Sequence, residues 1–227
     1  MNLTEYLGEW TKVMDERELL KVMSQLNTLY GTTLISPNKK DVFKAFTLCP
    51  YNNLKVIMLG MDPYPQKNVA TGILFGNNLE EPGATLSLSP SLQILKEGVI
   101  DYTIPHGNIV FDNTLESWAK QGVLMLNSAL TVEVNKIGSH TQLWRLFMSR
   151  LLQNLSINNP GLIYVLFGKQ AQTFIPYINK ANYLISCNHP AYHARNGTPM
   201  DTGIFKEVNR ILQQTNNDSV QWYQEIN

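Results

Sequence analysis

Four short apolar segments, separated by stretches with helical spacing, constrain the fold of this chain most strongly. They cover residues 55–59, 123–126, 162–167 and 183–187, and each has the length of a buried strand. Helical patterns lie near 91–101, 113–121, 143–155, 169–178 and 203–212. This alternation predicts an α/β fold with a central, mostly parallel four-stranded sheet and helices on both faces.

We expect the 227 residues to form a single domain. Residues 1–50 would form N-terminal helices and residues 54–212 the core. Residues 213–227 would form a polar, loosely held tail, which Trp222 and Tyr223 could dock on the core. Asp15 with Glu18 is typical of a capping box at a helix start. Ser36 followed by a proline predicts another helix, ending near residue 46.

Polar residues follow every predicted strand. Asp62 follows the first, Asn127 the second, Gly168 with Lys169 the third and His189 the fourth. Each is also an ordinary turn residue when taken alone. In parallel sheets, however, ligands bind beyond the carboxyl ends of the strands, so the combination predicts one site with a carboxylate, an amide, a cation and an imidazole.

Composition excludes several classes of protein. Eighteen acidic and eighteen basic residues cancel, so any contact with nucleic acid must be local rather than a property of the whole surface. Cys49 and Cys187 are far apart in apolar surroundings, as reduced core thiols are, and no metal centre is implied. The chain lacks a signal peptide pattern and a membrane-spanning apolar run, so we expect an intracellular protein without a membrane partner.

Six motifs in order carry a resemblance to a known family. GMDPYP, GILFGN, SPSLQILKEG, LMLNSALTV with GSH, LFGKQAQ and NHPAYHARN are similar to the ordered motifs of family 1 uracil-DNA glycosylases. The resemblance covers roughly residues 54–210. It implies hydrolysis of the N-glycosidic bond between uracil and deoxyribose, which leaves an abasic site and requires no cofactor.

The chemistry of this reaction suits two of the residues. Its transition state carries positive charge on the sugar and negative charge on the departing base. The resemblance makes Asp62 the general base for water and the charge opposite the sugar, and makes His189 the group that stabilises the uracil anion. Both are therefore expected to be catalytic.

The resemblance also implies how uracil is recognised. A base inside a duplex must flip out before an enzyme can reach it. Phe75 would stack on the flipped uracil, Asn127 would pair with its Watson–Crick edge, and the backbone of Met61 would face a uracil oxygen. Tyr64 would collide with the 5-methyl group of thymine, held by the rigid prolines on either side of it.

DNA contacts are expected from three further segments. Ser91 resembles the serine that meets a phosphate at a helix start. Gly168 and Lys169 correspond to a glycine-serine loop. The loop 189–195 would enter the minor groove, through the side chains Ala191, Tyr192, His193 and Arg195.

The chain departs from the family pattern at several positions. Met61 stands where the family has glutamine, and Pro65 where it has a histidine that contacts phosphate. The leucine that wedges into DNA is missing: His193 occupies its position, and Tyr192 could stack in its place. We therefore expect weaker or altered binding and excision on duplex DNA, with an intact pocket for the base.

Several alternatives stay open. The departures resemble divergent viral members of the fold, some of which serve as polymerase processivity partners, so a DNA-binding role with little catalysis is the second hypothesis. A glycosylase for another damaged base is the third, although Tyr64 and Asn127 favour uracil. His189 and His193 have metal-like spacing, but Pro190 and a loop setting argue against a shared helical face. His140 either supports the site or is structural.

The expected partners follow from the resemblance. They are single- or double-stranded DNA containing uracil, and a proteinaceous glycosylase inhibitor or a replication protein could also bind. We expect a monomer, located in the cytoplasm of a bacterium or in the nucleus or host cell if the source is eukaryotic or viral.

Overall fold

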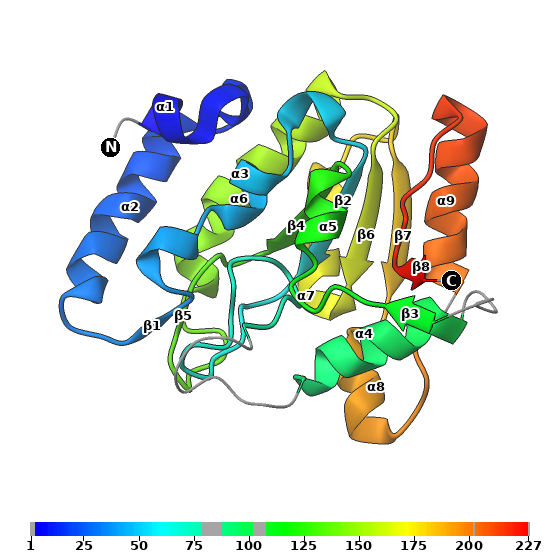
Figure 1. Cartoon of the computed structure of the whole chain (residues 1–227). Coiled ribbons are helices and arrows are strands. Elements are labelled where there is room, and N and C mark those ends of the chain that lie inside the picture. The colour runs from blue at the N-terminus through cyan, green and yellow to red at the C-terminus, as the bar shows by residue number, and fades with distance from the viewer. Residues whose placement is uncertain (1–2, 79–87, 102–107, 202, 227) are drawn as a thin grey trace.

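A four-stranded parallel sheet forms the centre of the molecule (Figure 1). The computed structural model describes residues 3–78, 88–101, 108–201 and 203–226. The strand order is β4-β2-β6-β7, and all neighbouring strands are parallel. The predicted fold class is therefore confirmed, with strands β2 (Val56–Gly60), β4 (Val123–Asn127), β6 (Ile163–Phe167) and β7 (Tyr183–Cys187).

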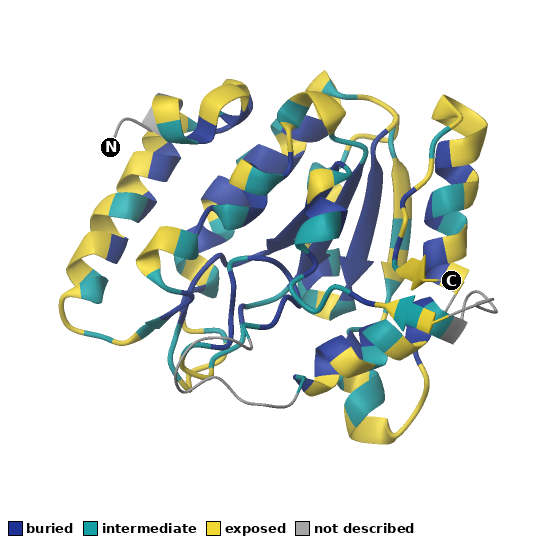
Figure 2. Cartoon of the chain, viewed as in Figure 1, coloured by how far each residue is buried: buried dark blue, intermediate teal, exposed yellow. Residues whose placement is uncertain are grey.

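Burial explains why three of these strands are continuously apolar. Every residue of β2, β4 and β6 is buried, whereas the edge strand β7 is half-exposed (Figure 2). A sheet covered on both faces needs apolar side chains at successive positions. Alternate residues divide between two cores: Ile57 and Leu59 join one cluster, and Val56 and Met58 join the other.

Helices cover both faces of the sheet, as predicted. The first core holds the N-terminal helices and a long central helix, and the second holds three helices on the opposite face. On the first face lie α1 (Leu3–Leu7), α2 (Glu16–Tyr30), α3 (Lys44–Leu48), α6 (Thr141–Asn158) and α7 (Gly168–Gln172), and on the second α4 (Pro90–Asp101), α5 (Glu116–Lys120) and α9 (Gly203–Asn216).

Short elements complete the described chain. Two small antiparallel sheets pair β1 (Ile35–Ser36) with β5 (Val132–Glu133) and β3 (Asn108–Val110) with β8 (Gln224–Ile226). The remaining elements are α8 (Pro190–Asn196) and the 3-10 turns η1 (Gly8–Lys12), η2 (Lys39–Asp41), η3 (Tyr51–Asn53) and η4 (Ile175–Tyr177). No helix in the described part of the chain is long and apolar enough to span a bilayer.

Local predictions near the N-terminus had mixed outcomes. Asp15 does cap α2, since its carboxylate accepts a hydrogen bond from the amide of Glu18 at 3.0 Å. The prediction that one helix runs from Ser36 to about residue 46 was wrong in its start and its continuity, since only the short turn η2 and helix α3, which extends to Leu48, lie in this region. Ser36 ends strand β1, and its hydroxyl donates to the carbonyl of Tyr64 at 2.9 Å instead of capping a helix.

The C-terminal segment is docked on the second core. Trp222 is buried, and its ring lies 4.8 Å from Trp118 and 5.1 Å from Phe205. The indole of Trp118 also donates to the backbone carbonyl of Trp222 at 2.9 Å. The buried Trp222 ring therefore anchors this segment, together with polar contacts such as the ion pair between Lys55 and Asp218 at 2.6 Å.

Strand order locates the site. The chain runs from β2 to β4 on one side and then crosses back to β6 on the other side of β2. Such a reversal leaves a crevice at the carboxyl ends of the central strands. The segments that follow Gly60, Asn127, Phe167 and Cys187 meet there.

Candidate active site

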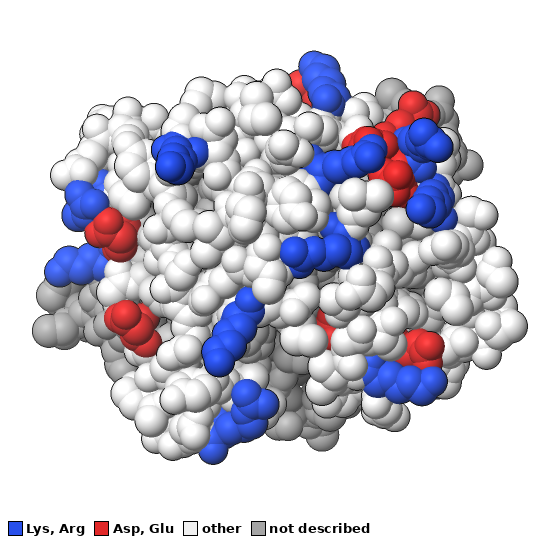
Figure 3. Space-filling model, turned by 180° about the vertical axis from the view of Figure 1, so that it is seen from behind, with Lys and Arg blue, Asp and Glu red and all other residues white. Residues whose placement is uncertain are grey.

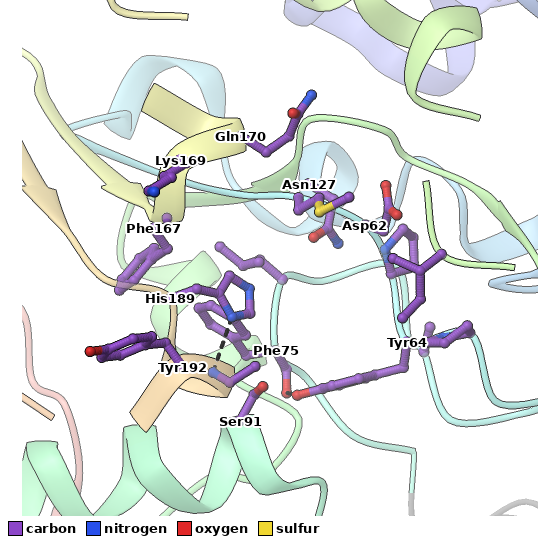
Figure 4. A pocket seen from close by; sticks show the side chains of 18 of the residues that line it. Asp62, Tyr64, Phe75, Ser91, Asn127, Phe167, Lys169, Gln170, His189 and Tyr192 are labelled. Carbon is purple, nitrogen blue, oxygen red and sulfur yellow. Dashed lines mark hydrogen bonds between the residues drawn. The ribbon is translucent and has the colours of Figure 1, made fainter. Parts of the chain in front are cut away.

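One cavity of about 700 Å³ opens at the carboxyl ends of the strands. It is lined by all the residues that the sequence analysis selected except His193: Met61, Asp62, Tyr64, Phe75, Ser91, Asn127, Gly168, Lys169, His189, Ala191, Tyr192 and Arg195. In Figure 4, Asp62 and His189 lie on opposite sides, with Asn127 between them. Three segments that are distant in the sequence thus bring a carboxylate, an amide and an imidazole to one space.

Asp62 is positioned by a loop far away in sequence. Its Oδ2 accepts a hydrogen bond from the backbone amide of Gly138 at 2.5 Å, while its buried Oδ1 has no partner among the described residues. Burial raises the pKa of Asp62, and the Gly138 amide offsets part of that rise. One carboxylate oxygen is therefore fixed and the other remains able to accept a proton.

The turn that carries Asp62 is braced on several sides. Ser128 donates its hydroxyl to the carbonyl of Met61 at 3.0 Å, and the hydroxyl of Tyr64 donates to the carbonyl of Phe75 at 3.2 Å. Burial raises the pKa of Tyr64 well above its ordinary value, so its hydroxyl stays protonated as a donor. The tyrosine wall is thus held by a hydrogen bond as well as by the adjacent prolines.

His189 caps the helix that follows it. Its Nδ1 accepts a hydrogen bond from the amide of Ala191 at 3.1 Å (Figure 4). Because Nδ1 is the acceptor, the neutral ring carries its proton on Nε2. Burial, together with the nearby charge of Arg195, lowers the pKa of His189 to about 4. The imidazole is therefore neutral near pH 7 and offers one N–H donor.

Gly168 allows His189 to approach closely. Its φ is +82°, and a Cβ at this position would lie 3.0 Å from the Cβ of His189. Any side chain would be strained in this backbone conformation and would crowd the imidazole. Glycine is therefore required at the start of α7.

Phe75 has an unusual backbone for an aromatic residue. Its φ is +64°, which is rare for a side chain of this size and indicates a local constraint. Its ring packs edge to face against Phe167 at 5.2 Å and near the ring of His189 at 5.3 Å. These contacts hold the ring against the cavity.

Asn127 ends strand β4 and is buried. No described residue donates to its Oδ1, so its amide keeps hydrogen-bonding capacity for a ligand. A Cβ at Gly60 would lie 3.2 Å from this oxygen and 2.3 Å from Cδ1 of Leu74. The neighbouring strand therefore has room for the amide only because it ends in glycine.

The segment 189–195 was expected to be a loop, and this prediction was wrong. Pro190 begins helix α8, because proline suits the first helical position and His189 caps it. His193 lies outside the cavity, and its Nδ1 pairs with the hydroxyl of Thr198 at 3.0 Å. The described residues contain no cluster of three metal-binding side chains, so the His189–His193 spacing is not part of such a cluster.

Two questions from the sequence concern residues beyond those discussed above: the role of His140, and the residues that the sequence did not single out. His140 is buried and pairs with the hydroxyl of Thr131 at 2.8 Å outside the cavity, which favours its structural interpretation. Sequence reasoning missed Gly138, whose only signal was the GSH motif, and Phe167, which looked like ordinary strand core. Residues 79–87, between Phe75 and Ser91, lie outside the described residues.

Comparisons with known proteins place this chain in one family. The model of the uracil DNA glycosylase superfamily matches residues 46–213. The uracil-DNA glycosylase of Mycoplasmopsis pulmonis is 36% identical over 201 residues, covering 87% of this chain and 86% of that protein. That of Yersinia pseudotuberculosis is 37% identical over 191 residues, covering 83% and 81%.

Solved structures share the fold. The structure of mimivirus UNG Y322F in complex with UGI matches with a TM-score of 0.78 and 24% identity, over 91% of this chain and 83% of that one. The wild-type UNG structure from Nitratifractor salsuginis matches with a TM-score of 0.62 and 19% identity, over 91% of this chain and 90% of that one. With its motifs, its sheet order and these relatives in agreement, the chain belongs to the uracil-DNA glycosylase family.

Proposed function

We propose that this chain hydrolyses the N-glycosidic bond between uracil and deoxyribose in DNA and leaves an abasic site. The observation that carries the proposal is the convergence of Asp62 and His189 on opposite sides of one cavity. Water is the co-substrate and no cofactor takes part. Because the substrate is DNA, an intracellular location belongs to the same proposal.

Asp62 acts on the sugar side. Its unpaired Oδ1 accepts a proton from the attacking water, and its negative charge stabilises the positive sugar in the transition state. The Gly138 amide keeps the other oxygen in place. Because burial raises the pKa of Asp62, the carboxylate is also a better base than an exposed aspartate.

His189 acts on the base side as a neutral donor. Its Nε2–H donates to a uracil oxygen and strengthens this bond as negative charge develops on the leaving base. A pKa of about 4 means that the ring stabilises charge by hydrogen bonding and keeps its proton. Asn127 reads the Watson–Crick edge, Phe75 stacks on the ring, the backbone of Met61 faces a uracil oxygen and Tyr64 excludes thymine.

DNA is held mainly by groups around the cavity. Ser91 at the start of α4, Gly168 and Lys169 at the start of α7, and Arg195 on α8 all line it. Figure 3 shows some lysine and arginine side chains in a broken line down the middle of one face, and others at its edges beside acidic side chains. This local arrangement supports phosphate contacts in a chain with no net charge.

Tyr192 takes the role of the missing leucine wedge. Its side chain is 46% exposed on α8 and also lines the cavity. An exposed ring beside the pocket can stack on the bases left behind when uracil flips. Tyr192→Ala is expected to reduce excision from duplex DNA more than from single strands. Tyr183→Ala, at the opposite end of β7, is the matched control; an equal loss on both DNA forms would contradict the wedge role.

The activity is tested with a labelled oligonucleotide containing one uracil, followed by alkaline cleavage. Strand scission is expected for the unmodified protein and for the control Glu207→Gln, an exposed carboxylate on α9. His189→Leu is expected to lower kcat by roughly 10²–10³-fold, as loss of one transition-state donor does, and Asp62→Asn is also expected to lower it. Absence of scission by the unmodified protein would refute the proposal.

Partner binding belongs to this proposal as well. One mimivirus relative was crystallised with UGI, and we extend UGI binding to this chain because its fold matches over 91% of its length. A replication protein remains the further partner predicted from the sequence. Competition between UGI and the uracil oligonucleotide tests the first of these.

A further inference from the structure

An exposed isoleucine lies at the rim of the cavity and has no role in the function proposed above. Ile137 is 71% exposed, the highest fraction of any large apolar side chain among the described residues. It nevertheless lines the cavity. A single exposed apolar residue is ordinary on a protein surface, so its surroundings decide whether it matters.

The loop that carries Ile137 is attached to the catalytic turn at two points. The amide of Gly138 donates to Asp62, and the amide of Asn135 donates to the carbonyl of Pro65 at 2.9 Å. Ile137 lies between these two attachments. Its backbone is therefore held at the rim, and its side chain stays exposed because the loop is fixed there.

Met61 extends the apolar surface on the same side. Its side chain lines the cavity, and its Cε lies 3.8 Å from the position that a Cβ on Gly138 would occupy. We call Met61 and Ile137 the apolar rim. Two uncharged, apolar side chains are unsuited to a phosphate, so this rim fits a nucleobase better than the DNA backbone.

The distance from Asp62 decides which nucleobase can reach the rim. Asp62 contacts Gly138 directly, and Ile137 is the residue before Gly138, with its Cα about 3.8 Å away. Ile137 therefore lies within about the length of one nucleotide from the sugar that Asp62 faces. We propose that the apolar rim binds the nucleobase next to the flipped uracil on the same strand. This inference rests on the proposed function, which puts the uracil sugar beside Asp62.

Flipping gives this contact a physical purpose. When uracil leaves the stack, the neighbouring base loses a stacking partner and exposes an apolar face. When Ile137 covers that face, apolar surface of both the side chain and the base is removed from water. The contact is uncharged, so its contribution is expected to be insensitive to salt, unlike the contacts of Lys169 and Arg195.

The test is equilibrium binding of a labelled single-stranded oligonucleotide with one uracil, measured by fluorescence anisotropy. All proteins carry Asp62→Asn, so that binding is measured whether or not the chemistry occurs. Ile137→Ser is expected to raise Kd roughly fivefold, the equivalent of about 1 kcal/mol. Competition by free uracil is expected to be unchanged, because uracil fills the pocket without reaching the rim.

Ile157→Ser is the matched control. Ile157 is 56% exposed near the end of α6, and it is about 24 Å along that helix from Thr141 beside the site. This substitution is expected to leave Kd unchanged. An equal rise in Kd for Ile137→Ser and Ile157→Ser would overturn the inference.

Oligonucleotides with a base-free spacer on one side of the uracil identify the contact. One oligonucleotide carries the spacer on the 5′ side of the uracil and a second carries it on the 3′ side. On one of these two, the Asp62→Asn parent protein is expected to bind as weakly as Ile137→Ser binds intact DNA, and Ile137→Ser is expected to weaken binding no further. An unchanged Kd for Ile137→Ser on intact DNA would refute the proposal, and so would an equal effect on intact and both spacer substrates. Excision by the unmodified protein is scored separately, so failure of the enzyme proposal is distinguishable from failure of this one.

Discussion

The neutral state of His189 predicts a specific dependence of stability on pH. In the folded protein the pKa of His189 is about 4, against 6.5 for an unperturbed histidine. Between these values the unfolded chain binds a proton that the folded chain does not, so this residue makes the protein less stable as the pH falls. The perturbation that isolates the effect is His189→Asn, because asparagine does not titrate and remains a good helix cap.

The size of the effect follows from the two pKa values. At pH 7 the His189 contribution is well below about 1 kcal/mol, whereas at pH 5 it reduces the free energy of unfolding by about 2 kcal/mol. Below the folded pKa the loss levels off at about 3 kcal/mol. The unmodified protein is therefore expected to lose about 2 kcal/mol more than His189→Asn between pH 7 and pH 5.

Urea unfolding at both pH values measures this difference. Asp62 titrates with the opposite sign, because burial raises its pKa and favours the protonated form in the folded state. Its contribution is present in both proteins and is removed in the comparison. Equal pH dependence for the two proteins would show that His189 is not held neutral by burial, and the assigned donor role would then lose its basis.

Three further predictions concern Asp62, Tyr64 and Trp222. As the pH is lowered, excision should decline with a midpoint above 3.8, the ordinary pKa of aspartate, because activity requires ionised Asp62 and burial raises its pKa. A pH–rate profile of kcat tests this, and a midpoint at or below 3.8 would contradict it. Tyr64→Ala should admit thymine and lower kcat/KM for uracil, as measured by base release from matched oligonucleotides; continued exclusion of thymine would show that another residue forms the wall. Trp222→Ala should lower the free energy of unfolding by about 3–5 kcal/mol, as removal of a buried tryptophan does, because the ring packs on Trp118; a change below 1 kcal/mol in urea unfolding would show that the C-terminal segment is dispensable.

The chain alone was enough to predict the sheet and the position of the site. The apolar runs before Gly60 and Asn127 have the length of strands buried on both faces, and their alternation with helical patterns favours strands over buried helix segments. Parallel strands end at one edge, so the polar residues that follow them were expected to meet there. The separate motifs around Asp62 and His189 therefore pointed to one cavity without any coordinates.

Only the tertiary structure decided the contacts between segments that are distant in the chain. Ser36 looks like a helix cap in sequence, yet its hydroxyl donates to the carbonyl of Tyr64, 28 positions later. Gly138 carries no side chain to suggest a role, and only its amide at 2.5 Å from Asp62 gives it one. Such choices depend on which hydrogen-bonding partner the folded chain places nearby, and local sequence preferences contain no information about that placement.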